Sequence, residues 1–401
     1  MTTSYRVTDE ILTANDQGFE TVIAQAYVDK IRPSCLCQPK GIAMYIAKIA
    51  GKHVIKRMPG TGVEHAATCE SYEPPIELSG LGQVFGSAIQ ENADDGLTAL
   101  KFDFSMRKMG RRIEPSAGGG ESDSVKTDGN KLSLRATLHF LWERGSFNRW
   151  SPAMEGKRSW FVIRKYLLQA SAGMVAKKTA LSDLIYIPES FQTERKDEIS
   201  QRRVSQMAKI CASSTGTTQL MLLVGEVKEL KRHATGHKLW LKHVPDCGFN
   251  VNDDLEKRLR KRFANELALR GEYEDSHLMA IATVSMSTTG LPYVEEIALM
   301  LVNQNWIPFE NLHEKFLLDA LHKANRRFTK GLRYNLPSDA PLAAAVLSDT
   351  TPLPTGLYVT PIGATEEAVS EMLEMSEQSA IAAWTWNPIE QGVMPELPQA
   401  S

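Results

Sequence analysis

Two short motifs in the first quarter of the chain, Cys35-Leu36-Cys37 and His65-Ala66-Ala67-Thr68-Cys69, contain four residues of the kinds that bind zinc. Three thiols and one imidazole make a complete tetrahedral ligand set, with no coordination position left open for a substrate. The spacing therefore predicts a structural zinc site that holds a small N-terminal module together. On a helical turn, His65 and Cys69 would share a face and reach the same metal.

The chain between the two motifs is strand-like and basic. Residues 43–49 and 53–58 have β character, and Ala50-Gly51-Lys52 between them is typical of a hairpin turn. From Lys30 to Val63 the chain has seven basic residues and no acidic one. A solvated basic face would explain this charge, and so would contacts with phosphates and bases. The predicted nucleic-acid contacts in this region are Tyr45, Lys48, Lys52, Lys56 and Arg57.

A second basic stretch interleaves cations with aromatic residues. It reads Arg326-Arg327-Phe328-Thr329-Lys330-Gly331-Leu332-Arg333-Tyr334. Cations beside aromatic rings are typical of surfaces that contact phosphates and stack on bases. The predicted contacts here are Arg326, Arg327, Lys330 and Arg333.

A third motif, Gly225-Glu226-Val227-Lys228, follows an apolar strand-like run. Glu226 and Lys228 would share a strand face, as in the magnesium site of restriction-type nucleases, and Glu189 would supply the second carboxylate. The upstream acid is Glu rather than the usual Asp, and no helical glutamine follows. The same alternation is typical of a polar face in an oligonucleotide-binding barrel, lined by Glu226, Lys228, His237 and His243, and the sequence does not distinguish the two.

The composition is that of an ordinary globular protein. Of the 401 residues, 42% are hydrophobic and 23% charged, and the net charge of -2 permits only local basic patches. The longest aliphatic runs are too short to cross a membrane, and the acidic N-terminus does not read as a secretory signal. Five cysteines, three of them near one histidine, favour metal over disulfides. We therefore expect a cytoplasmic protein without a membrane partner.

The order of strand-like and helical segments predicts an α+β fold with a small N-terminal zinc module and a larger mixed α/β region. Helices are expected at 132–144, 159–178, 193–212, 253–269 and 309–324. Strands are expected at 184–188, 219–229, 237–244, 278–284 and 294–302. The predicted units are 1–104 (module with the zinc site), 105–131 (flexible loop or linker), 132–182 (helical), 183–362 (mixed α/β) and 363–401 (C-terminal helix and loose tail).

Several stretches together resemble one bacterial family. They are Cys35-Leu36-Cys37, Lys56-Arg57-Met58-Pro59-Gly60-Thr61-Gly62 with His65 and Cys69, Leu78-Ser79-Gly80-Leu81-Gly82, Phe147-Asn148-Arg149-Trp150-Ser151-Pro152, Gly225-Glu226-Val227-Lys228, and Lys330-Gly331-Leu332-Arg333-Tyr334-Asn335-Leu336. The family is the domain of unknown function 1173, found largely on plasmids and integrative elements. The resemblance implies a role in DNA transactions of a mobile element and supplies no mechanism.

The leading hypothesis is a non-catalytic, zinc-containing accessory protein that binds nucleic acid, DNA rather than RNA. One alternative is a magnesium-dependent nuclease that uses Glu189, Glu226 and Lys228. The other is a protein-interaction module whose zinc finger docks a partner from the same mobile element.

Overall fold

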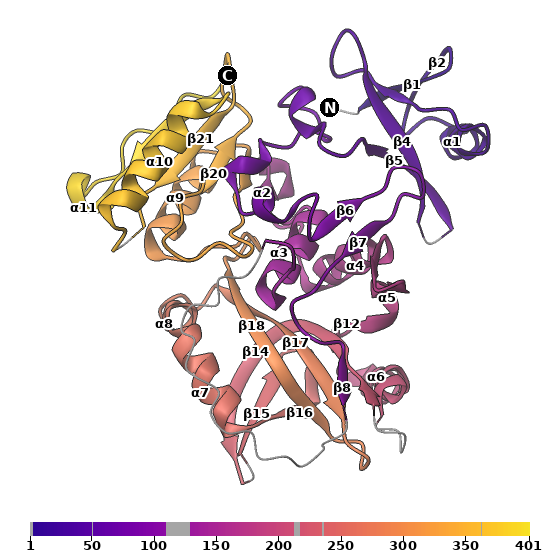
Figure 1. The fold of residues 1–401 in the computed structure, drawn as a ribbon, viewed down its shortest axis with the longest axis vertical. Coiled ribbons are helices and arrows are strands. Elements are labelled where there is room, and N and C mark those ends of the chain that lie inside the picture. Colours follow the sequence, from indigo (N-terminus) through magenta and orange to yellow (C-terminus); the bar gives the residue numbers. More distant parts are fainter. Residues whose placement is uncertain (1–2, 50, 110–128, 212–216, 235, 362) are drawn as a thin grey trace.

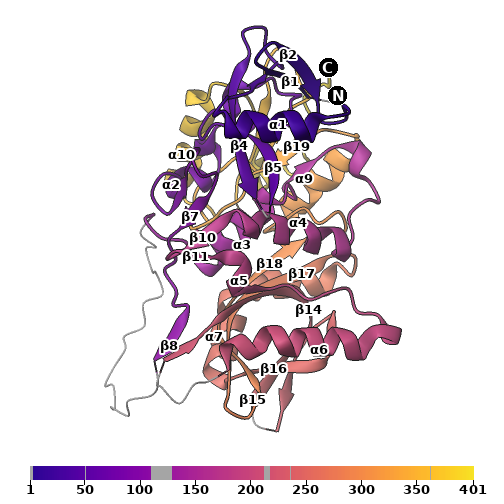
Figure 2. The same cartoon turned by 90° about the vertical axis from the view of Figure 1, so that its right-hand side faces the viewer.

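The computed structural model describes residues 3–49, 51–109, 129–211, 217–234, 236–361 and 363–401. The central part of the predicted linker, 110–128, lies outside the described residues. The chain has the expected α+β composition (Figure 1). The N-terminal module and the C-terminal sheet lie at the top of Figures 1 and 2, a helical layer crosses the middle, and a barrel lies at the bottom.

The N-terminal module is a five-stranded sheet covered by one helix. Its predicted hairpin is confirmed, with Ile49 opposite Lys52 across the turn. Helix α1 (Phe19–Val28) packs Ile23 and Ala26 against strand residues, which buries the module's own small core. The sheet order is β2 (Glu10–Thr13), β1 (Ser4–Val7), β3 (Ser34–Cys35), β4 (Ile42–Ile49) and β5 (Lys52–Arg57).

Five strands in the second half of the chain close into a barrel. They are β14 (Met221–His233), β15 (Gly236–Leu241), β16 (Val244–Val251), β17 (His277–Met286) and β18 (Pro292–Val302). The pairing order β14-β15-β16-β18-β17 returns to β14, and β16 runs parallel to β18. Helices α7 (Asp253–Arg262) and α8 (Ala264–Glu272) lie between β16 and β17 in the chain. This is the connectivity of an oligonucleotide-binding barrel, which the sequence left undecided.

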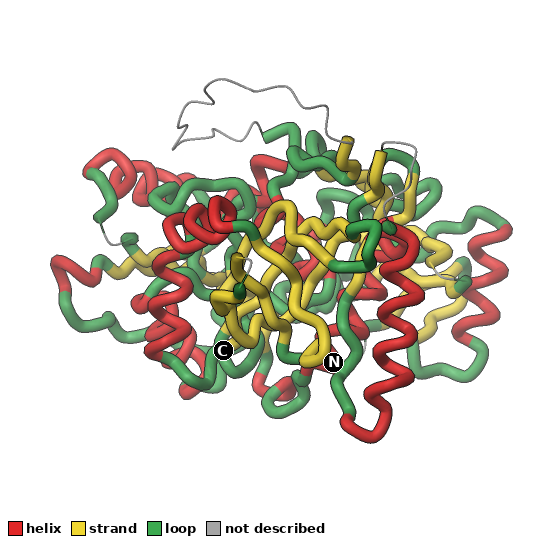
Figure 3. Tube along the Cα trace, turned by 90° about the horizontal axis from the view of Figure 1, so that it is seen from below, coloured by secondary structure: helices red, strands yellow, loops and turns green. Residues whose placement is uncertain are grey.

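Strand β14 closes the barrel because it pairs with a different partner at each end. Residues 221–226 pair with β17, residues 227–233 pair with β15, and a bulge lies between Val227 and Glu229. Bulges bend a strand and increase its twist, which allows one strand to serve both edges of the closure. Alternate residues such as Leu239 and Phe249 fill the interior and are fully buried. Viewed from below, the strands lie at the centre with helices on both sides (Figure 3).

The middle layer is built on α3 (Leu134–Arg144) and α4 (Trp160–Ala172). Helix α3 begins where Ser133 accepts a hydrogen bond from the Ala136 amide, and it packs on β17 and β18. Trp142 is fully buried and donates to the carbonyl of Trp306 at 2.9 Å. The helix expected at 159–178 ends early, because the chain turns at Gly173 into strand β10 (Met174–Ala176).

The C-terminal sheet draws its strands from distant parts of the chain. Its order is β22 (Ala382–Trp386), β21 (Thr355–Val359), β20 (Ala345–Leu347), β19 (Phe328–Lys330) and β9 (Arg149–Trp150). Helix α10 (Glu366–Gln378) packs on β21 and β22. The tail, expected to be loose, is held by hydrogen bonds: Trp384 Nε1 donates to the Glu396 carbonyl at 2.9 Å, and the Ser401 amide donates to the Asp349 carbonyl at 2.8 Å.

The shorter elements connect these parts. The strand expected at 184–188 is present as β12 (Ile185–Tyr186), and the helices expected at 193–212 and 309–324 are present as α6 (Lys196–Met207) and α9 (Leu312–Lys323). Each is shorter than expected. Among the described helices, none is long and apolar enough to cross a bilayer. The remaining elements are α2 (Leu81–Val84), β6 (Ile89–Glu91), β7 (Thr98–Leu100), β8 (Arg107–Met109), β11 (Thr179–Ala180), α5 (Leu181–Leu184), β13 (Thr217–Gln219) and α11 (Pro388–Gln391).

Gly331 gives a direct test of the C-terminal sheet. A Cβ at this position would lie 2.0 Å from the Ala343 carbonyl oxygen, so the backbone itself must move. We expect Gly331→Ala to lower the free energy of unfolding by about 1–3 kcal/mol or more, measured by urea denaturation. Gly271→Ala is the matched control, because nothing lies within 4 Å of its Cβ in helix α8. The control should be neutral or slightly stabilising; equal losses in both variants would contradict the packing.

Candidate metal centre

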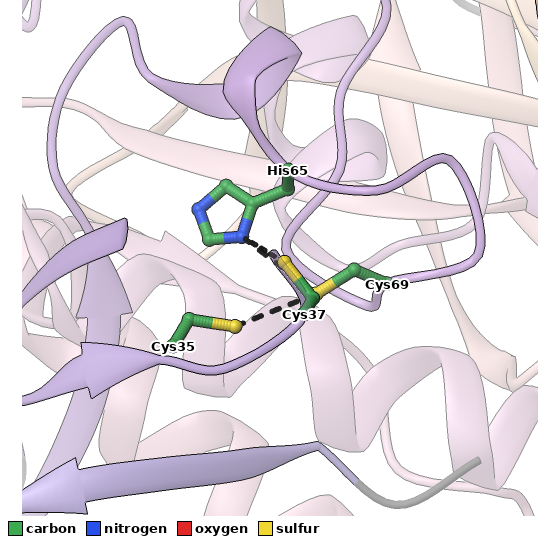
Figure 4. Close-up of side chains that lie close together, drawn as sticks. All are labelled: Cys35, Cys37, His65 and Cys69. Carbon is green, nitrogen blue, oxygen red and sulfur yellow. Dashed lines mark hydrogen bonds between the residues drawn. The ribbon is translucent and has the colours of Figure 1, made fainter. Parts of the chain in front are cut away.

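The four predicted ligands lie together, with all ligand atoms within 4.8 Å of one another (Figure 4). Cys35 Sγ lies 3.8 Å from Cys69 Sγ, and Cys37 Sγ lies 3.3 Å from His65 Nδ1. A tetrahedron with Zn–S of about 2.3 Å and Zn–N of about 2.0 Å has edges of about 3.8 and 3.5 Å. These two separations fit the edges of a tetrahedral site, and Nδ1 is the histidine atom that faces the thiols, so the set could hold a metal ion.

Two loops carry these ligands onto the sheet. Cys35 ends the short strand β3, and Cys37 lies in the turn that leads to β4. On the other side, His65 follows a 3-10 turn, and the Cys69 amide donates to the Ala66 carbonyl at 2.8 Å. The expected helical turn across His65 and Cys69 is therefore wrong; consecutive tight turns bring the two residues to one point.

The ionisation of the ligands couples metal binding to pH. Burial raises the pKa of the Cys35 thiol to about 12 and raises the pKa of Cys69. Burial also lowers the pKa of His65, which keeps the imidazole neutral and able to donate its lone pair. Thiolates are stable here only when a metal replaces their protons. Metal affinity, and the folding energy that it contributes, should therefore fall as the pH falls.

Comparison with protein families agrees with the motifs. A family model described as "Protein of unknown function (DUF1173)" matches residues 5–389, nearly the whole chain. The chain belongs to this family. Comparisons with curated proteins and with solved structures gave no match. The resemblance that the sequence motifs indicated is therefore confirmed.

One carboxylate of this DUF1173 protein connects the metal loops to the rest of the fold. Glu73, four residues after Cys69, is contacted by Arg57 of β5 and by Arg149 of β9, whose Nη2 lies at 3.4 Å. Arg149 Nη1 also donates to the Glu70 carbonyl at 2.6 Å. Burial alone would raise the pKa of Glu73, but these guanidinium groups hold it below its ordinary value. Sequence reasoning missed Glu73, because its partners come from separate segments.

The hairpin residues predicted to contact nucleic acid divide into two groups. Lys48 and Lys52 are exposed on either side of the turn. Tyr45 is buried, and Arg57 is held by Glu73. Lys56 is partly buried and lies 6.0 Å from the Tyr45 ring. Only Lys48 and Lys52 of this set are placed to meet a phosphate without rearrangement.

The second basic stretch is mostly interior, which corrects its interpretation as a contact surface. Arg326, Lys330 and Arg333 are each at most 4% exposed. Arg326 lies 2.8 Å from Asp349, Lys330 lies 3.2 Å from Glu314, and Arg333 contacts Glu310. Phe328 belongs to the buried strand β19 and Tyr334 is buried beyond it, so the pattern reflects internal packing and ion pairs. Arg327 is the exposed cation of the four.

The two carboxylates of the nuclease alternative already have side-chain partners. Glu189 accepts two hydrogen bonds from Arg202, at 2.7 and 2.9 Å, which lower its pKa. Glu226 Oε1 lies 2.8 Å from His277 Nδ1 and 2.9 Å from Lys242 Nζ. Burial would raise the pKa of Glu226, but these two partners hold it below its ordinary value. Lys228 is exposed; within the described ranges, the Cys/His set is the one group of three or more potential ligands that lies together.

Removal of one thiol tests the metal centre. Cys37→Ser should lower bound zinc from about one per chain to well below half, because three ligands hold the ion less tightly. The variant should also unfold its N-terminal module more easily, and wild-type protein should release zinc on acidification. Inductively coupled plasma mass spectrometry measures the zinc bound per chain. Cys211→Ser, at an exposed cysteine outside the ligand set, is the control and should keep its zinc. Unchanged zinc content in Cys37→Ser would show that Cys37 is not a ligand.

The buried ion pairs predict a difference between two neighbouring arginines. Arg333→Ala should cost about 1–3 kcal/mol in the free energy of unfolding, because it removes a cation from the half-buried Glu310 carboxylate and leaves the Pro337 and Ala340 carbonyls without their donor. Arg327→Ala, at an exposed position, should change stability by less than about 0.5 kcal/mol. Urea denaturation of both variants measures this. Similar values for the two would mean that Arg333 is not a structural residue.

Proposed function

We propose that this DUF1173 protein is a zinc-stabilised, non-catalytic accessory protein that binds nucleic acid. The observation that supports this most strongly is the barrel of β14 to β18, since its connectivity is that of a fold that binds oligonucleotides. Fold alone does not establish function. The proposal therefore also needs a surface with suitable charge.

The hairpin of the zinc module offers such a surface. Lys48 and Lys52 are exposed beside its tip. A Cβ at Gly173 would lie 3.3 Å from Ile49 Cδ1, so the tip rests against the start of β10. Two further exposed lysines, Lys177 and Lys178, come directly after β10. Lys177 is three residues from the start of that strand, which is about 10 Å along the chain at ~3.3 Å per residue. Lys48 and Lys52 therefore give the hairpin two solvent-exposed cations on a protein with little net charge.

The zinc centre supports this role without taking part in chemistry. Three thiols and an imidazole leave no open coordination position, so a zinc ion would hold the loops beside the hairpin and activate nothing. We further propose that the partner is DNA rather than RNA, and that the protein acts in the cytoplasm for a plasmid or integrative element. The DNA partner and the mobile-element setting rest on the family resemblance, and the cytoplasmic location rests on cysteines that favour metal over disulfides.

Equilibrium binding at several salt concentrations tests the proposal. Fluorescence anisotropy of labelled single-stranded and duplex DNA and RNA should show affinity that falls steeply between 50 and 200 mM salt, because each neutralised phosphate releases counterions. Lys48→Glu with Lys52→Glu should weaken binding and reduce the log–log salt slope for duplex DNA by about two. Lys257→Glu with Lys209→Glu changes the charge equally at other exposed sites and should have little effect.

The same assay separates the two alternatives. Degradation of the probe with magnesium, abolished by Lys228→Ala, would replace the proposal by the nuclease. Absence of binding to every probe at 50 mM salt would overturn the proposal. A stoichiometric protein partner recovered after nuclease treatment would then favour the interaction module.

A further inference from the structure

A row of side chains crosses the outer face of the barrel. Each member is the register partner of the next across β14, β15, β16 and β18. Partners in paired strands point to the same face of a sheet. Their neighbours Leu239 and Phe249 fill the barrel interior, so the row points outward. The row consists of Lys231, Lys238, Asn250 and Tyr293.

An indole lies beside this row on the same face. Trp240 is two positions from Lys238 on β15 and is partly exposed. Gly248 of β16 makes room for it: a Cβ there would come within 2.9 Å of the Trp240 ring and 3.1 Å of Lys238 Cδ. A second ring, that of Tyr293, is 41% exposed at the other side of the face. The face therefore presents two aromatic rings with lysines beside them.

This combination matches the chemistry of an unpaired nucleic-acid strand. Exposed bases stack on aromatic side chains, and lysines follow the phosphates, whereas bases in a duplex are already stacked on one another. Lys231 Nζ lies 2.6 Å from Glu229, so a phosphate would compete with that carboxylate. The stem of Lys238 and the Trp240 ring both lie against Gly248, so the lysine and the indole share this part of the face.

We propose that this outer face, defined by Lys231, Lys238, Trp240, Asn250 and Tyr293, binds single-stranded nucleic acid. Trp240 and Tyr293 stack on successive bases, and Lys238 and Lys231 contact the backbone. The inference rests on the proposed function, to which it adds the type of strand and the surface that holds it.

The test uses the full-length protein and a fluorescein-labelled dT12 oligonucleotide. Trp240→Ala and Tyr293→Ala should each bind this probe about tenfold or more weakly, because a stacking platform is lost. Trp240→Phe keeps a ring and should retain most of the affinity. The oligonucleotide should also quench tryptophan fluorescence of the wild type, and Trp240→Phe should remove much of that quenching. A merely structural role for Trp240 would not produce this last change.

Two controls keep the outcomes distinct. Phe161→Ala removes a ring that is 67% exposed in helix α4 and should leave binding unchanged. Thermal melting of each variant checks that it is folded. If both barrel variants bind dT12 like the wild type while the double hairpin variant does not, the barrel face is excluded and the proposed function stands. If the wild type binds no nucleic acid, the proposed function and this inference both fail.

Discussion

The bend in β14 is the constraint on which the larger part of the fold depends. One strand pairs with β17 over its first half and with β15 over its second, so the sheet closes on itself. Gly225 lies two residues before the bulge, and a Cβ there would meet the Leu241 side chain at 2.8 Å. Closure buries one continuous set of apolar residues, against which the helical layer and then the C-terminal sheet pack. The outer face of the barrel is left for solvent or a ligand.

Short-range patterns in the sequence were informative, and long-range partners were not. The ligand set Cys35, Cys37, His65 and Cys69 and the hairpin could be predicted because spacing and turn chemistry act over a few residues. Arg333 was misinterpreted because its partner, Glu310, lies in a separate segment before α9, and only the folded chain brings the two together. Barrel closure likewise depends on register between strands, which alternation alone does not fix.

The basic residues of this protein therefore serve two purposes. Arg326, Lys330 and Arg333, on and beside β19, are buried and pair with carboxylates, because an unpaired charge would be costly to bury. Lys48 and Lys52 of the hairpin and Lys231 of the barrel remain in contact with solvent. A count of cations along the chain does not separate these roles, because both occur in stretches with few acids. Burial decides between them, and it is known only from the tertiary structure.

The pairing of β9 with β19 has a consequence for how the chain folds. Asn148 donates to the carbonyl of Lys330, 182 positions further along the chain. Contacts of such sequence separation form only after a long loop has closed, and a high proportion of them slows folding. During synthesis, β9 emerges well before its partner and remains an unpaired edge until the last quarter of the chain is made. The N-terminal module has no such delay, because all four of its metal ligands lie within thirty-five residues of one another.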